Sequence, residues 1–335
     1  MKQPTRRQAA RRPAPVTSAP ARSGPAATVA ICTYDRYDML ARSVARLQQQ
    51  SLPADRFEIL VVDNTPDPAR SAETAEAYAR IDNLRWMHVD KPGLSNARNV
   101  ASAVARAPVI VYLDDDAFAA PDWLERMLAA YEVLGDGVVG IGGRVLPHFT
   151  SPVPDWLSPA MLPYLSVLDL GGEVRPLQPG EWVVGANVSY RVAKLHEAGG
   201  FSPALGRIGS GISLMSNDET ELATRLEALG GAIGYTPHAM VEHCIDPSRL
   251  SQEWMRRRIA WQAVSDFVRA PQETRAEIDR HWHDLKIFLA HQPPHLRTLR
   301  ALALPQGSAG DLHWQMSAVY GAVICLLGGV ADSDD

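Results

Sequence analysis

Three adjacent aspartates, Asp114, Asp115 and Asp116, directly follow the apolar run at residues 109–113. Side chains alternate along an extended chain, so Asp114 and Asp116 are expected on one side, about 6 to 7 Å apart along the backbone, while Asp115 points away. Mg²⁺ or Mn²⁺ relieves the repulsion between such carboxylates by binding one or two of them together with phosphate oxygens. The triplet therefore predicts a metal site whose natural co-ligand is a diphosphate. The alternative is a solvated acidic turn before the next helix.

From residue 28 to residue 144, short runs of β-branched residues alternate with segments of helical periodicity. The strands and helices that these segments form must position the three carboxylates. This alternation is typical of an α/β fold with a doubly wound, mostly parallel sheet flanked by helices. Strands are expected at residues 28–33, 57–63, 84–90, 109–114 and 138–144, and helices at residues 37–47, 94–105 and 122–134. Thr33, Asp63, Asp90 and Asp114 end four of these strands. Such carboxyl ends open onto the crevice where open α/β sheets bind ligands.

The second part of the chain is less regular. Residues 146–179 contain seven prolines and no sustained period, so an irregular segment over the active face is expected. A strand is expected at residues 181–190, a short helix at 192–198, a loop at 199–217 and a helix at 218–229. Beyond residue 251 the chain is expected to be helical, with interruptions near Pro293 and Pro305. We therefore predict a catalytic domain at residues 28–250, with a nucleotide-binding half (28–145) and an acceptor-binding half (146–250), and a helical C-terminal region at 251–335.

Charge is unevenly distributed along the 335 residues, which carry 33 basic and 38 acidic side chains. Residues 1–27 are rich in proline and alanine, contain no acid and are expected to form a disordered tail. The six basic residues of this tail are Lys2, Arg6, Arg7, Arg11, Arg12 and Arg22. Without them, 27 basic residues face 38 acidic ones, a formal charge of about −11. A nucleic-acid partner would require the opposite sign, so none is expected.

The chain shows no secretory signal pattern, and its three cysteines have no CxxC spacing. A disulfide framework or zinc site is therefore not indicated, and a cytoplasmic setting is expected. Residues 314–331 are apolar and barely long enough to span a bilayer, but they lack flanking basic residues and are followed by Asp332, Asp334 and Asp335. A packed helix or a peripheral membrane contact is expected there instead.

Seven motifs occur along the chain: ICTYDR (31–36), VVDNT (61–65), GLSNARN (93–99), DDD (114–116), GAN (185–187), GGF (199–201) and NDETEL (217–222). By their order and spacing, the chain resembles the family 2 glycosyltransferases from about residue 28 to about residue 262. The resemblance implies the GT-A fold, a nucleotide-diphosphate sugar as donor, Mn²⁺ or Mg²⁺ as cofactor, and transfer with inversion to an acceptor hydroxyl. The acceptor is left open as a saccharide, a lipid-linked molecule or a small molecule.

The resemblance also implies roles for the matched residues. Thr33, Asp35 and Arg36 would line the nucleotide pocket, and Asp63 would accept a hydrogen bond from the base. The alternative for Asp63 is a turn residue before Pro66. Further contacts to the nucleotide or donor sugar would come from Gly93, Asn96, Arg98, Asn99, Asp114, Asp115 and Asn187. For Asn96 and Arg98 the alternatives are a helix cap and a surface ion pair.

By the same resemblance, the next residues concern the metal and the diphosphate. Asp116 would bind the metal, with Asp114 holding the ribose or a metal-bound water. His243 follows a strand-like run where related enzymes place a histidine near the metal or diphosphate; a structural histidine is the alternative. Arg257, between Arg256 and Arg258, would clamp the diphosphate or belong to a solvated helix face.

Inverting transfer needs a base near the acceptor hydroxyl, and the family uses an acid from a Glu-Asp pair that opens a helix. Matching Glu221 and Leu222 to this pattern puts Glu219 at the base position with Asp218 beside it, so the pair is reversed here. Glu219 is favoured, and Asp218 stays open. The alternative for both is a pair of charges that stabilises the helix N-terminus.

Two other functions compete with glycosyl transfer. A sugar-nucleotide nucleotidyltransferase would show a glycine-rich, arginine-containing loop after the first strand, whereas residues 33–36 contain no glycine. A non-catalytic carbohydrate-binding protein of the same fold cannot be distinguished by fold alone. The aspartate triplet together with the later acid pair favours the enzyme.

Overall fold

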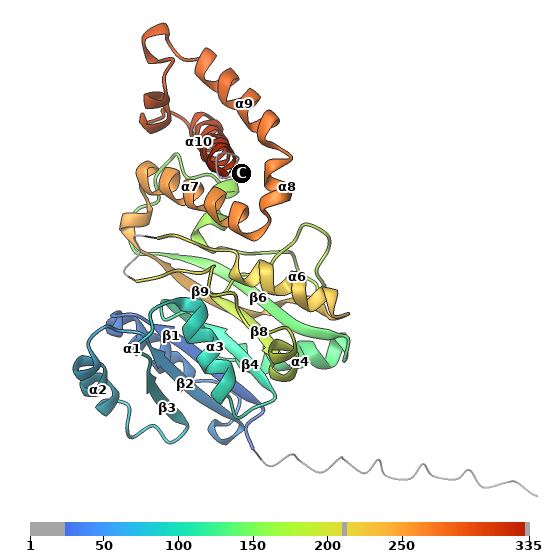
Figure 1. The fold of residues 1–335 in the computed structure, drawn as a ribbon. Helices are drawn as coiled ribbons and strands as arrows, with labels where there is room; N and C mark the ends of the chain where they lie inside the picture. The colour runs from blue at the N-terminus through green and yellow to red at the C-terminus, as the bar shows by residue number, and fades with distance from the viewer. Residues whose placement is uncertain (1–23, 210–212, 332–335) are drawn as a thin grey trace, which may run out of the picture.

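The computed structural model describes residues 24–209 and 213–331, and it shows a sheet with flanking helices joined at one end to a further group of helices (Figure 1). Most of the tail predicted to be disordered, residues 1–23, lies outside the described residues. Its last residue, Ala27, already belongs to the first strand. The predicted α/β class is confirmed.

Four parallel strands form one half of the sheet, in the order β3-β2-β1-β4. They are β1 (Ala27–Thr33), β2 (Phe57–Asp63), β3 (Leu84–His88) and β4 (Val109–Leu113). β1, β2 and β4 are almost wholly buried, which suits continuous runs of β-branched residues covered on both faces. Thr33 aligns with Asp63, and Ala30 aligns with Tyr112. This register brings the end of β1 level with the aspartate triplet.

The other half of the sheet contains mixed pairings. It consists of β8 (Asn187–Arg191), β6 (Val138–Phe149), β9 (Ala232–Ile245), β5 (Ala117–Ala119) and β7 (Arg175–Pro176). β8 lies antiparallel between β4 and β6, and β9 runs parallel to β6. Ala117 of β5 aligns with His243 of β9, and the Cys244 amide donates to the Asp116 carbonyl. The β5–β9 pairing therefore carries His243 to the aspartate triplet.

Helices cover both faces of the sheet. α1 (Tyr37–Leu47) and α4 (Trp123–Leu134) share one apolar core with the sheet. On α1, Leu40, Val44 and Leu47 recur at helical spacing and are buried. α3 (Leu94–Val104), α5 (Val192–Glu197) and α6 (Asp218–Ala228) pack on the other core, and α2 (Pro68–Glu76) contacts β3. The N-termini of α3 and α6 thereby face the crevice that follows β4.

A helical extension follows β9 and the short helix η3 (Pro247–Arg249), and it lies at the far end of the molecule in Figure 1. It comprises α7 (Gln252–Arg269), α8 (Pro271–Arg275), α9 (Ile278–Ala290) and α10 (Ala309–Ala331), with η4 (Pro294–Leu296) and η5 (Leu299–Ala303) between the last two. α10 packs against α7 and α9, burying Leu312, Met316 and Ile324. The apolar segment at residues 314–331 is thus part of a packed helix. Within the described ranges, no helix has the combined length and hydropathy needed to cross a bilayer.

Several predicted boundaries were wrong. Only residues 187–190 of the strand predicted at 181–190 lie in the sheet, where β8 continues to Arg191. The irregular segment predicted from residue 146 begins later, because β6 continues through Pro147 to Phe149 along β9. That segment also contains η2 (Pro159–Leu165). The strand-like run identified before His243 is part of β9, which continues through His243 to Ile245. The short strand β5 and α2 were not predicted, since their residues show no clear period of their own.

Candidate active site

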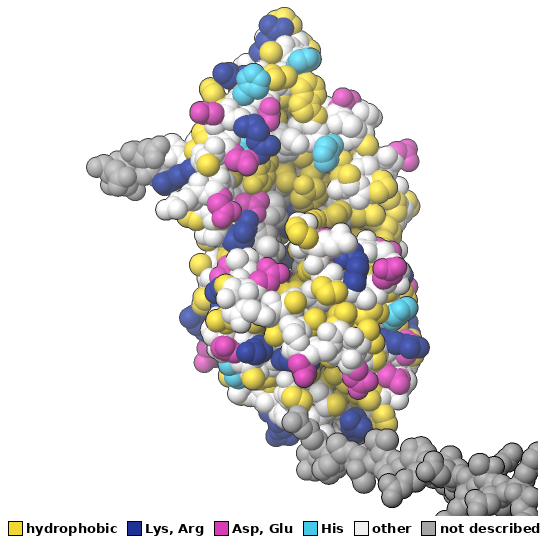
Figure 2. Space-filling view, turned by 90° about the vertical axis from the view of Figure 1, so that its right-hand side faces the viewer, with side chains coloured by type: hydrophobic (Ala, Val, Ile, Leu, Met, Phe, Trp, Pro, Cys, Tyr) yellow, Lys and Arg dark blue, Asp and Glu magenta, His cyan; other side chains and the backbone are white. Residues whose placement is uncertain are grey.

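A cavity of about 1240 Å³ lies between the carboxyl ends of the parallel strands and helix α7. Its wall combines the loop after β1, the aspartate triplet, the start of α6, part of η2 and one side of α7. Figure 2 shows the molecular surface hollowed near its middle, with charged side chains beside the opening. The sheet edge and the helical extension therefore enclose a single polar site.

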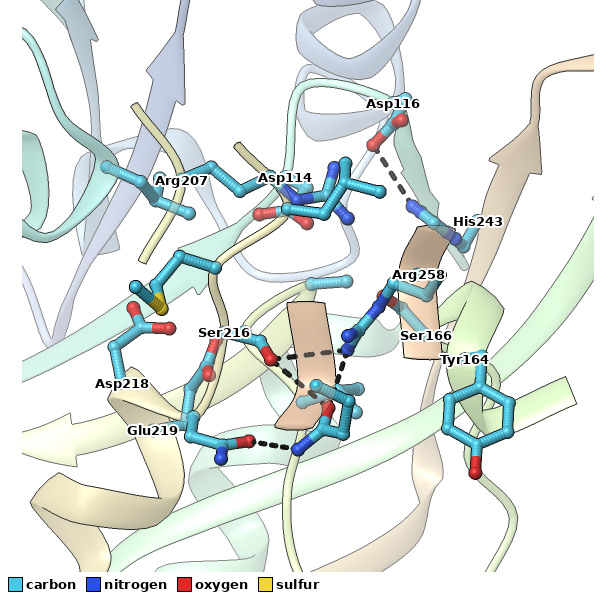
Figure 3. Close-up of a pocket in the computed structure, with 18 of the residues that line it drawn as sticks. Asp114, Asp116, Tyr164, Ser166, Arg207, Ser216, Asp218, Glu219, His243 and Arg258 are labelled. Carbon is cyan, nitrogen blue, oxygen red and sulfur yellow. Dashed lines mark hydrogen bonds and ion pairs between the residues drawn. The ribbon is translucent and has the colours of Figure 1, made fainter. Parts of the chain in front are cut away.

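Asp114, Asp116 and His243 form the centre of this site. Each offers one ligand atom, and these atoms lie within 4.8 Å of one another. Nε2 of His243 lies 3.3 Å from Oδ1 of Asp116, and Figure 3 shows the two side chains facing each other. The alternative considered for His243 was a structural histidine. Its Nδ1 does make a contact inside the protein, at 3.0 Å from the Leu165 carbonyl oxygen.

The histidine contacts indicate how this group would receive a metal. A carbonyl oxygen only accepts hydrogen bonds, so Nδ1 of His243 carries the proton and Nε2 faces the carboxylate of Asp116. If the imidazole is neutral, the lone pair of Nε2 points at the negatively charged oxygen of Asp116, and the two repel each other. A proton or a cation between the two atoms removes the conflict. Two carboxylates and one imidazole are donors that suit Mn²⁺, so the residues fit the predicted ion.

Asp115 and Arg36 occupy the side of the triplet nearest β1. Oδ2 of Asp115 accepts a hydrogen bond of 2.8 Å from the Thr33 hydroxyl. Arg36 bridges the triplet, with Nη1 2.9 Å from Asp115 and Nη2 2.8 Å from Asp116. Arg249 approaches the same Oδ2 of Asp116 at 3.6 Å. Burial alone would raise the pKa of Asp116, but His243, Arg36 and Arg249 together hold it well below its ordinary value.

The acid pair at the start of α6 lies across the cavity and is held by Arg98. Nη1 of Arg98 lies 2.6 Å from Asp218 and 2.8 Å from Glu219, and Nη2 lies 3.6 Å from Asp114. Arg98 is 2% exposed, so this guanidinium is a buried link between the acid pair and the metal group. A β-carbon on Gly185 would collide with Glu219 and Arg98, which explains the glycine at that position.

The two acids differ in ionisation. Burial and the neighbouring Glu219 carboxylate raise the pKa of Asp218 to about 7, although Arg98 opposes the shift. Burial would also raise the pKa of Glu219, but the Arg98 guanidinium and a hydrogen bond with Asp218 outweigh it and lower the pKa. Glu219 is therefore the carboxylate that stays ionised at neutral pH, and its side chain is more exposed than that of Asp218.

Replacing Arg98 by Met is expected to lower the free energy of unfolding by about 3 kcal/mol, because removing one partner leaves buried charges uncompensated. Urea unfolding followed by circular dichroism measures the change. Arg126→Met is the matched control, because Arg126 forms an exposed ion pair with Asp122 on α4, and such pairs contribute about 1 kcal/mol or less. Equal losses in the two variants would show that Arg98 is not a buried countercharge.

Most of the predicted site residues line the cavity. These are Thr33, Asp35, Arg36, Gly93, Arg98, Asp114, Asp115, Asp116, Asp218, Glu219, His243 and Arg257. Arg98 contacts the acids and not a surface partner, so the alternative of a surface ion pair was wrong. Gly93 begins α3 with a φ of 126°, a value that favours glycine.

Four residues that were predicted to contact the nucleotide do not line the cavity, and their polar atoms bind other parts of the protein. Asp63 is fully buried and accepts hydrogen bonds from Tyr37 and Thr65. The side-chain amides of the three asparagines donate to backbone carbonyls: Asn96 to Lys91, Asn99 to Phe201, and Asn187 to Arg144 and Ala239. For these four residues the structure supports roles in shaping the crevice, and the direct contact to the nucleotide stays a prediction.

Sequence reasoning missed other cavity residues, among them Asn64, Arg207, Arg249 and Arg258. Arg249 follows His243 by six residues, so its position after the same strand was a usable signal. Arg207 lies in the loop before α6, where no local pattern distinguishes it. Arg258 was considered only as a neighbour of Arg257.

Comparisons with known proteins agree with this geometry. Residues 28–173 match the family model described as Glycosyl transferase family 2. The Glucosyl-dolichyl phosphate glucuronosyltransferase of Haloferax volcanii is 25% identical over 277 residues, which are 81% of this chain and 86% of that protein. The Succinoglycan biosynthesis protein ExoM of Rhizobium meliloti is 23% identical over 239 residues, covering 69% of this chain and 70% of that protein.

A solved structure shows the same fold. The mannosyltransferase PcManGT from Pyrobaculum calidifontis, in complex with GDP-Man and Mn²⁺, superimposes with a TM-score of 0.59 at 20% identity. The match covers 91% of this chain and 88% of that one. It therefore includes the helical extension as well as the sheet.

Proposed function

We propose that this chain, a GT-A glycosyltransferase whose residues 28–173 match glycosyl transferase family 2, uses a nucleotide-sugar donor, inverts the anomeric centre and depends on a divalent cation. The acceptor supplies a hydroxyl. One observation carries the proposal: Arg98 joins the acid pair of α6 to the Asp114, Asp116 and His243 group within one cavity. A candidate base and a candidate diphosphate site therefore face each other.

The proposed roles follow from this arrangement. Asp114, Asp116 and His243 would hold Mn²⁺ or Mg²⁺, which when bound supplies Lewis-acid stabilisation of the leaving diphosphate. Arg36 and Arg249 place further positive charge at the same end of the cavity. Glu219 accepts the proton of the acceptor hydroxyl as that oxygen attacks the anomeric carbon. Arg98 keeps the Glu219 carboxylate ionised and oriented, and Gly185 leaves room for both side chains.

Inversion requires that the acceptor oxygen attacks the anomeric carbon from the side opposite the leaving group. The acid pair and the metal group lie on different walls of the cavity, an arrangement that suits such an attack. The cavity residues Thr33, Asp35 and Gly93 are proposed to contact the nucleotide. Similarity to the Glucosyl-dolichyl phosphate glucuronosyltransferase of Haloferax volcanii keeps a lipid-linked acceptor among the candidates. A peripheral membrane contact through residues 314–331 stays a prediction.

The proposal predicts metal-dependent donor binding. Among common UDP, GDP and dTDP sugars, at least one is expected to raise the unfolding temperature of the full chain with Mn²⁺, and to lose the effect when EDTA replaces the metal. A ligand at 100 times its Kd stabilises the folded state by about 2.7 kcal/mol, which is readily measured by differential scanning fluorimetry.

Release of nucleoside diphosphate distinguishes glycosyl transfer from non-catalytic binding and from nucleotidyl transfer. A donor that stabilises the chain equally in EDTA would contradict metal dependence. A non-catalytic protein would bind a donor without ever releasing the diphosphate, even slowly to water. A nucleotidyltransferase would instead release pyrophosphate from a nucleoside triphosphate and a sugar phosphate.

A further inference from the structure

Arg258 on α7 is a buried cation whose hydrogen bonds are incomplete. The residue lines the cavity and is only 9% exposed. Its Nη2 donates to Gln262 at 3.0 Å and to Ser216 at 3.3 Å, whereas Nη1 is buried with no hydrogen-bond partner in the described part of the chain. A buried, unsatisfied, charged donor is costly, so its presence beside a cavity calls for an explanation.

Burial and Arg207 outweigh the carboxylates of Asp266 and Glu219, which raise the pKa of Arg258 through space. Among the described residues no carboxylate forms an ion pair with it, and both hydrogen-bond acceptors are neutral. Burial, and after it the positive charge of Arg207, lower the pKa of Arg258 to about 10. Arg207 also lines the cavity, and its side chain forms no hydrogen bond or ion pair within residues 24–209 and 213–331. The carboxylates of Asp114 and Asp116 act on Arg207, however, so Arg207 belongs to the metal side of the cavity, whereas Arg258 has no ion-pair partner in the described part of the chain.

The partners of Arg258 place it on the side of the acid pair. Gln262, which accepts from Arg258, donates to Asn217, the residue that begins α6 immediately before Asp218 and Glu219. In Figure 3, dashed lines join Arg258 to Ser216, while Asp116 is joined to His243. The metal group has its own arginines, Arg36 and Arg249.

We propose that Arg258 forms a subsite for an anionic group on the acceptor. The inference rests on the proposed function, because inverting attack places the acceptor beside the base and the leaving diphosphate on the opposite side. A phosphate or a carboxylate would complete the hydrogen bonds of Arg258, since a guanidinium matches either oxyanion. The acceptor class is therefore an anionic glycan or glycosyl phosphate, not a neutral sugar.

The test measures anion binding while the donor site is filled. The full chain is saturated with Mn²⁺ and with whichever of UDP and GDP binds it, and then titrated calorimetrically with glucose 1-phosphate, glucuronate and glucose. The phosphate or the carboxylate is expected to bind at least about tenfold more tightly than glucose. The stronger of the two anions identifies which group the acceptor carries.

Three variants test whether Arg258 causes the preference for the anionic sugar. Arg258→Gln is expected to remove the preference for the anionic sugar while changing nucleoside diphosphate affinity less than twofold. Arg258→Lys should keep part of the preference, which a merely structural role would not explain. Arg126→Gln should behave like the unmodified chain, because the Arg126 side chain is exposed on α4.

Other outcomes overturn the inference. Equal binding of all three sugars, or an unchanged anion preference in Arg258→Gln, would show that Arg258 binds no acceptor anion. Anion binding only in the absence of nucleotide, or a parallel loss of nucleotide affinity in Arg258→Gln, would assign Arg258 to the donor. If neither UDP nor GDP binds, dTDP takes their place; if none of the three binds, the proposed function fails, and the sugar titrations without nucleotide still decide the subsite.

Discussion

Replacing Asp116 by Asn is expected to lower the rate of sugar transfer roughly 1,000-fold, because a bound metal contributes several kcal/mol to the stabilisation of the leaving diphosphate and each 1.36 kcal/mol is a factor of ten. Asp116 is the member of the metal group with the most contacts, meeting His243, Arg36 and Arg249. Asparagine keeps the shape of the side chain and removes the charge that attracts the cation.

Two measurements separate this effect from misfolding. Nucleoside diphosphate release from the active donor gives the rate, and calorimetric titration with Mn²⁺ gives the metal affinity, which is expected to fall in parallel. Asp122→Asn is the matched control, because Asp122 forms an exposed ion pair with Arg126 at the start of α4. Full turnover by Asp116→Asn would exclude the proposed metal site.

Replacing Glu219 by Gln is expected to lower the transfer rate about 10³-fold, within the range that a positioned general base contributes. Glutamine preserves the size of the side chain and a hydrogen bond to Arg98 or the acceptor, but it cannot take a proton. Asp218→Asn is the matched control, with an expected loss of less than about tenfold. If the losses are reversed, Asp218 is the base.

The pH profile of transfer gives an independent answer. A base works only when ionised, and the pKa of Asp218 is raised to about 7 while that of Glu219 is lowered. With Glu219 as base, the rate should stay nearly level as the pH falls from 8 to 6. With Asp218 as base, the rate should fall about tenfold per unit below pH 7, because the protonated fraction of Asp218 then dominates.

The sheet and its motifs could be predicted because they depend on short-range patterns. Continuous β-branched runs identified β1, β2 and β4, and the helical spacing of Leu40, Val44 and Leu47 identified α1. The aspartate triplet directly after β4 indicated a metal, since three adjacent carboxylates need a cation or open water. These local features were sufficient for the fold and the general chemistry.

The partners of each side chain could not be predicted in the same way. Asp63 and Asn187 follow the family motifs, yet Tyr37 and the carbonyls of Arg144 and Ala239 occupy their polar atoms. A motif specifies which residue stands at a position in the chain. It does not specify whether neighbours distant in sequence already satisfy that residue.

By itself, the sequence determined the α/β fold, the strand that ends in Asp114 to Asp116, and the acid pair that opens α6. Only the tertiary structure decided that His243 meets Asp116, that Arg98 joins the metal group to Glu219, and that Nη1 of Arg258 has no hydrogen-bond partner among the described residues. The physical reason is separation along the chain: β5 pairs with β9 across more than a hundred residues, and α7 reaches the cavity from the helical extension. Such contacts depend on packing of the whole molecule, which no local pattern encodes.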